Sequence, residues 1–171
     1  MTTFTVIHVL ISLAGIGTGV VVLAGLLTAR RLETWTAAFL VTTVATSVTG
    51  FMFPFEHLLP SHAVGVLSLI VLAVGIYARY ARHIAGWWRP AFVISAVVAL
   101  YFNVFVLVVQ LFLKVPALKV LAPTQSEPPF AIAQLAVLVT FAVLGVLAVR
   151  AFHPDKTGTG DRTPAPLQAL S

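Results

Sequence analysis

Five long, nearly uninterrupted apolar runs constrain this chain more than any other feature of its sequence. A helix needs about 20 predominantly apolar residues to cross the hydrocarbon core of a bilayer. The runs lack the strict alternation of barrel strands, so the sequence predicts an all-α fold: a polytopic membrane helical bundle with five transmembrane helices. We expect the spans at about residues 4–29, 35–55, 61–80, 90–113 and 130–151.

The composition agrees with lipid as the main solvent. Of the 171 residues, 60% are hydrophobic and 9% are charged, whereas soluble domains carry about 25% charged residues. The chain has no cysteine, which excludes disulfides, thiolate metal sites and covalent haem attachment. We expect one transmembrane domain over residues 1–151. The polar stretch 152–171, rich in Pro, Gly and Thr, predicts a disordered cytoplasmic tail.

The basic residues indicate which way the bundle faces. Eight of the ten Lys and Arg residues follow the first, third and fifth spans, and the positive-inside rule makes that side cytoplasmic. The N-terminus is then outside and the C-terminus cytoplasmic, as an odd number of spans requires. The first span has its arginines after the apolar run, which is the reverse of a signal peptide, so we expect it to be retained. The net charge of +5 is thereby explained without a nucleic-acid partner.

Small residues predict how the helices pack. Gly15 and Gly19 lie one turn apart in the first span, and the second and third spans carry similar small-residue faces. Because such faces let membrane helices approach closely, we expect a tight core of the first three helices. Asn103, deep in the fourth span, is interpreted as a residue that joins helices by an interhelical hydrogen bond.

Polar side chains collect toward the predicted outer ends of the spans. The stretch FPFEHLLPSH, between the second and third spans, is the densest ionisable cluster, and the first and fourth spans add further polar groups at the same depth. A polar group in hydrocarbon needs a partner or a water-lined cavity. The sequence therefore predicts an outer-leaflet polar pocket formed by His8, Glu56, His57, His62, Gln110 and Lys114.

These residue types favour a redox cofactor, a metal or a quinone-like ligand. Imidazoles and carboxylates bind zinc, copper and iron, and His8 and His62 are the candidate metal ligands. His8 facing His62 or His57 from another helix would suit a b-type haem. A quinone head group would use the same hydrogen-bonding groups. The cofactor stays unassigned between haem b, a metal ion and these alternatives.

A rival hypothesis makes the chain a non-catalytic accessory or assembly subunit of a membrane complex, whose polar cluster only holds helices together. A small-solute transporter is less favoured, because the cytoplasmic half offers few polar groups and no repeat is present. No catalytic signature occurs, so enzymatic activity is left open. A homo-oligomer or a membrane-complex partner, in addition to the lipid bilayer, is left open too.

The connection LKVPALKVLAPTQSEPPF predicts an ordered cap, with Glu127 in a lid over the pocket.

Three runs carry a resemblance to known proteins. The chain resembles small uncharacterised bacterial multi-pass membrane proteins of unknown function in the runs FPFEHLLPSH, YFNVFVLVVQLFLKVPAL and APTQSEPPF. The resemblance implies a location in the bacterial inner (cytoplasmic) membrane, and it carries no activity and no functional residues. The chain does not resemble the better-known cytochrome b families, whose paired histidines lie within helices.

Overall fold

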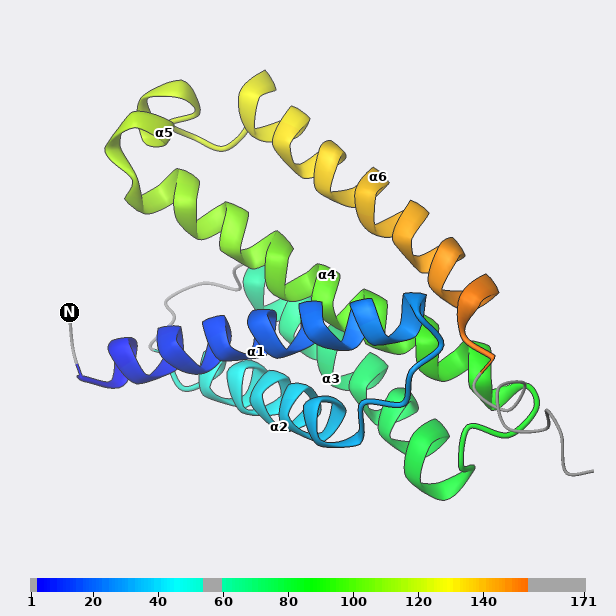
Figure 1. The fold of residues 1–171 in the computed structure, drawn as a ribbon. Helices are drawn as coiled ribbons and strands as arrows, with labels where there is room; N and C mark the ends of the chain where they lie inside the picture. The colour runs from blue at the N-terminus through cyan, green and yellow to red at the C-terminus, as the bar shows by residue number, and fades with distance from the viewer. Residues whose placement is uncertain (1–2, 54–59, 154–171) are drawn as a thin grey trace, which may run out of the picture.

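The computed structural model describes residues 3–53 and 60–153, with the side chains of residues 60–62 excepted. The regular elements of the described chain are all helices, which confirms the all-α part of the predicted fold class (Figure 1). The elements are α1 (Thr3–Leu27), α2 (Glu33–Gly50), α3 (Pro60–Ile76), the π-helical turn η1 (Tyr77–Ala81), α4 (Trp88–Lys114), the short α5 (Pro116–Leu121) and α6 (Pro128–Ala151).

Among the described residues, four helices are long and apolar enough to cross a membrane. They are α1, the stretch Ala63–Ala81 of α3 and η1, α4, and α6. The chain is therefore a multi-pass helical membrane protein. The remaining predicted span, 35–55, corresponds to α2, which has 18 residues and carries seven Thr and Ser side chains. These hydroxyls lower the mean hydropathy of α2, so α2 is not among the four candidate spans.

Helices α1 to α4 form a four-helix bundle, and α6 lies outside it. Each of α1 and α3 packs between α2 and α4, and α6 runs along α4 (Figure 1). Helix α4 is the most buried of the four candidate spans, whereas α6 has a single buried residue, Ala148. The largest fully buried side chains include Phe39 of α2 and Phe92 and Leu100 of α4. Helix α4 is thus the central element of the fold.

The small-residue faces are used, but with a different partner from the predicted one. Gly19 of α1 lies against Phe39 and Leu100, so α4 and not α3 completes the contact with α1 and α2. Gly75 of α3 also faces α4, at Ser95. The expected core of the first three helices is therefore wrong in this respect, because α1 and α3 make little contact with each other and each packs against α2 and α4 instead.

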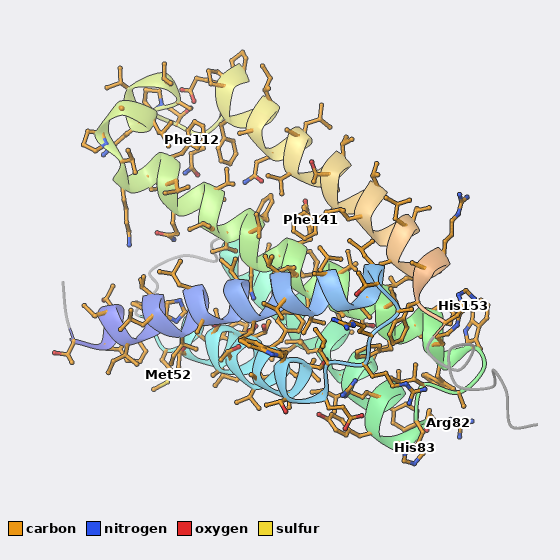
Figure 2. All side chains as sticks on the ribbon, viewed as in Figure 1. Met52, Arg82, His83, Phe112, Phe141 and His153 are labelled. Carbon is orange, nitrogen blue, oxygen red and sulfur yellow. The ribbon has the colours of Figure 1, made fainter. Side chains whose placement is uncertain are left out.

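Successive helices run in opposite directions, which gives the molecule two chemically different ends (Figure 1). One end, here called the basic end, carries Arg82, His83 and His153 (Figure 2). There Arg89 donates a hydrogen bond to the carbonyl oxygen of Phe152, which ties the start of α4 to the end of α6. The described arginines of this end are Arg30, Arg31, Arg79, Arg82, Arg89 and Arg150.

Candidate functional site

Helix α2 makes one side-chain hydrogen bond to each of its three neighbouring helices. We call this row of bonds the α2 polar seam, and it runs through the interior of the bundle toward the end opposite the arginines. Its bonds join Asn103 Nδ2 of α4 to Thr43 Oγ1 (3.3 Å), Ser47 Oγ to Ser68 Oγ of α3 (3.2 Å), and His8 Nδ1 of α1 to Thr49 Oγ1 (2.8 Å).

The seam shows why polar residues are tolerated in these helices. Thr43, Ser47, Ser68 and Asn103 are all buried, and a buried polar group is costly unless it is hydrogen-bonded. The bond from Asn103 to Thr43 confirms the interpretation of Asn103 as a helix-joining residue. Thr46 Oγ1 is the exception on α2, because it is buried without a hydrogen-bond partner in the described part of the chain.

The His8 imidazole has a defined orientation. Thr49 Oγ1 lies 2.6 Å from the carbonyl oxygen of Ala45, one turn earlier in α2. A hydroxyl carries one proton, and the short distance to the Ala45 carbonyl favours its donation there. With that proton donated to Ala45, Thr49 Oγ1 accepts from His8, and we infer that Nδ1 carries the ring hydrogen. In the neutral ring this leaves Nε2 as the lone-pair nitrogen.

Aromatic and glycine residues hold the same ring in place. The Phe53 ring contacts the His8 ring edge-on, with centroids 5.0 Å apart, and Phe4 packs against Phe53 at 4.9 Å. A Cβ on Gly50 would lie 3.8 Å from His8 Cε1. The half-buried imidazole thus lies between the ends of α1 and α2, where FPFEHLLPSH begins.

Helix α4 brings a cation to this end. Lys114, in its last turn, is exposed and close enough to His8 to interact with it electrostatically. Gln110 lies one turn earlier on α4 and is half-buried. Lys114 and Gln110 therefore lie on α4 at the end of the bundle that carries His8, and a shared site of the three stays a prediction.

The other three predicted site residues are not described at side-chain level. Glu56 and His57 lie outside the described residues, and His62 is placed only by its backbone, in the first turn of α3. Over the residues that are described, no group of three or more His, Asp or Glu could hold a metal ion. The pairing of His8 with His62 stays a prediction.

Two glutamines fasten α6 and the α5–α6 connection to the same half of α4. Gln134 Nε2 donates to the carbonyl oxygen of Phe105 at 3.2 Å, and Gln125 Nε2 donates to that of Val109 at 3.0 Å. These carbonyls lie one turn apart. The rings of Phe112 and Phe141 lie between α4 and α6 (Figure 2), where Phe112 contacts Phe130 at 5.3 Å. The aromatic side chains of α4 thus help to dock α6.

Glu127 orders the connection itself. Its carboxylate accepts hydrogen bonds from the Thr124 backbone N–H (3.2 Å), the Thr124 hydroxyl (2.9 Å) and the Ser126 backbone N–H (3.1 Å). Desolvation raises the pKa of Glu127, but these hydrogen bonds outweigh it and leave the pKa below its ordinary value. The connection is therefore ordered, and the Glu127 carboxylate forms these hydrogen bonds with residues of the connection itself.

Sequence reasoning missed Thr49 as the partner of His8. The hydroxyl lies in TTVATSVTG, where the pattern of small residues indicates only close helix packing.

Comparisons of the chain with protein-family models, curated proteins and solved structures find no match, and no family is identified.

Proposed function

We propose that this membrane protein binds a redox-active ligand through His8, at the end of the bundle opposite the arginines. One observation carries the proposal: the hydrogen-bond chain from His8 Nδ1 through Thr49 Oγ1 to the Ala45 carbonyl oxygen. With the Thr49 proton donated to Ala45, this chain orients the ring and places its hydrogen on Nδ1. The same bond joins α1 to α2, and in the proposal it leaves Nε2 available for a ligand.

The residues present fit three related ligand classes. Metal-binding histidines typically donate their other ring N–H to an acceptor of the protein, which orients the ring, and Thr49 fills that role here. A haem iron would bind the same lone pair, and a quinol hydroxyl would donate to it. Phe4 and Phe53 would cover the ligand's apolar part, and Lys114 would pair with a propionate or other anionic group.

The partners of His8 would come from the stretch after α2. Phe53 contacts the His8 ring, so the chain leaves α2 beside the imidazole. Glu56, His57 and His62 are the proposed further contacts, with Gln110 contributing from α4. In this proposal α2 crosses the membrane as well, which brings the number of spans to five. The basic end is cytoplasmic, and the site lies in the outer leaflet of a bacterial inner membrane.

The test is ligand retention by protein purified in mild detergent. The absorption spectrum, metal content and solvent-extractable quinone are measured for wild type and for the variants His8→Leu and His62→Ala. We expect wild type to hold one of these ligands stoichiometrically and both variants to lose it. His83→Leu, an exposed residue at the basic end, is the matched control and should retain the ligand.

Two results would contradict the proposal. One is wild-type protein that holds no chromophore, metal or quinone. The other is His8→Leu protein that keeps the ligand at wild-type stoichiometry while folding normally.

The second candidate function is that of an accessory subunit. It is favoured by small residues that stay exposed on α1 after the bundle is packed: Ala14, Gly17 and Ala24 face outward beside Leu13 and Val20, and no neighbouring atom lies within 4 Å of a Cβ built on Gly17. Such a surface suits close contact with another membrane helix. In this case Gly17→Leu would disrupt a complex, and His8→Leu would have no effect on it.

A further inference from the structure

A groove of about 410 Å³ lies between α4 and α6. Val97 and Val98 of α4 and Phe141, Gly145 and Val149 of α6 line it, and Arg150 closes it at the basic end. Phe141 lies between the two helices in Figure 2. Apart from Arg150, the lining carries no charged side chain.

The α6 wall of the groove has the length of one leaflet, and the α4 wall, from Ile94 to Val98, is shorter. From Phe141 to Arg150 the α6 helix rises about 14 Å, at about 1.5 Å per residue. Half of the hydrocarbon core is about 15 Å. The groove therefore runs from near the bilayer midplane to the interface at the basic end, which is the depth range of a single acyl chain.

The groove is too narrow for a further helix. A Cβ built on Gly145 would lie 3.4 Å from Val97 Cγ1, so α4 and α6 are in direct contact along it. A helix with its side chains is about 10–12 Å across and could not enter between them. A flexible hydrocarbon chain can follow such a slot.

The mouth of the groove is positively charged. Arg150 lies in the last turn of α6 and is exposed, so its aliphatic stem can line the groove while its guanidinium reaches the interface. Arg89, in the first turn of α4, lies at the same end and is tied to Phe152. Guanidinium groups bind phosphate oxygens well because their donors match them in geometry.

We propose that the α4–α6 groove binds one acyl chain of an anionic phospholipid, whose phosphate pairs with Arg150. The apolar lining accepts the chain, the length matches one leaflet, and the arginine selects the headgroup. The site is separate from the His8 site, and neither depends on the other.

Lipid retention measured by native mass spectrometry tests the proposal. Delipidated protein in detergent is titrated with phosphatidylglycerol or with phosphatidylcholine of identical acyl chains. We expect wild type to retain one phosphatidylglycerol at a several-fold lower concentration than phosphatidylcholine. Arg150→Gln should remove this preference, and Ala142→Leu, which fills the groove, should weaken binding of both lipids.

Two matched controls separate the groove from general effects. Arg82→Gln removes an exposed charge at the basic end, and Ala136→Leu enlarges an exposed α6 residue outside the groove. Both should bind lipid as wild type does. Wild-type binding by Arg150→Gln and Ala142→Leu, equal binding of the two lipids by wild type, or a protein dimer that excludes lipid from the groove would each overturn the proposal. Thermal unfolding of every variant verifies that it is folded.

Discussion

Gly19 lies at the point where three helices are closest. A Cβ at this position would stand 2.6 Å from Leu100 Cδ1 of α4 and 2.8 Å from Phe39 Cε2 of α2. Both of those side chains are fully buried, at 1% and 0% exposure, so neither has space to move aside. Gly17, two residues earlier on the same helix, faces no atom within 4 Å.

This difference predicts opposite outcomes for the same substitution. Gly19→Ala should destabilise the protein by about 1–3 kcal/mol, the usual range for an overpacked core. Gly17→Ala should be neutral or slightly stabilising, since alanine has the higher helix propensity by about 1 kcal/mol. Reversible unfolding in mixed micelles measures both free energies. Equal effects of the two substitutions would show that α1 does not pack against α2 and α4 as described.

Helix α2 illustrates how an element of moderate hydropathy can still have a lipid-facing surface. Several of its hydroxyls donate to carbonyls one turn earlier, such as Thr42 to Ala38 and Thr49 to Ala45. The seam uses the inward face, while Trp35, Val41 and Val48 are 49%, 68% and 48% exposed. Apart from Thr46 Oγ1, the buried hydroxyls of α2 are therefore hydrogen-bonded inside the protein, and an apolar surface faces outward. On this basis we infer that α2 crosses the bilayer.

Cysteine labelling tests this inference for α2. The chain has no cysteine of its own, so single introduced cysteines report without background. Thr34→Cys and Met52→Cys place thiols on exposed residues at the two ends of α2. In intact cells, a membrane-impermeant maleimide should label Met52→Cys, and it should label Thr34→Cys only after permeabilisation.

Labelling of both thiols from the same side would show that α2 does not cross. Labelling of Thr34→Cys alone in intact cells would show instead that the bundle is inverted, with the arginines outside. The two failures are therefore distinguishable from each other.

At the scale of the whole molecule, the positions of the helices in the sequence could be predicted far better than the contacts between the helices. Apolar run length locates α1, α3, α4 and α6 to within a few residues, because a span must match the hydrocarbon thickness. Charge spacing likewise predicted that the arginines gather at one end. These are properties of single segments, and they do not depend on which segments touch.

The partners of each helix were less predictable. A small-residue face shows that something packs closely, but Gly19 could not reveal that Leu100 of α4 is its neighbour. Similarly, depth in the sequence predicted that His8 and Lys114 lie at the same end of the bundle, whereas Thr49 was not recognised as the hydrogen-bond partner of His8. Depth follows from position in the sequence, but a hydrogen-bond partner depends on how two helices are rotated about their axes.

The central claim is that Thr49 holds His8 with its proton on Nδ1, leaving Nε2 for a ligand. The most direct measurement is the ¹⁵N NMR spectrum of histidine-labelled protein in bilayers, with the His8 signals assigned by their loss in His8→Leu. We predict a protonated Nδ1 and an unprotonated Nε2 in wild type, and loss of this tautomer preference in Thr49→Val. A wild-type His8 protonated on Nε2, or a Thr49→Val spectrum identical to that of wild type, would contradict the account.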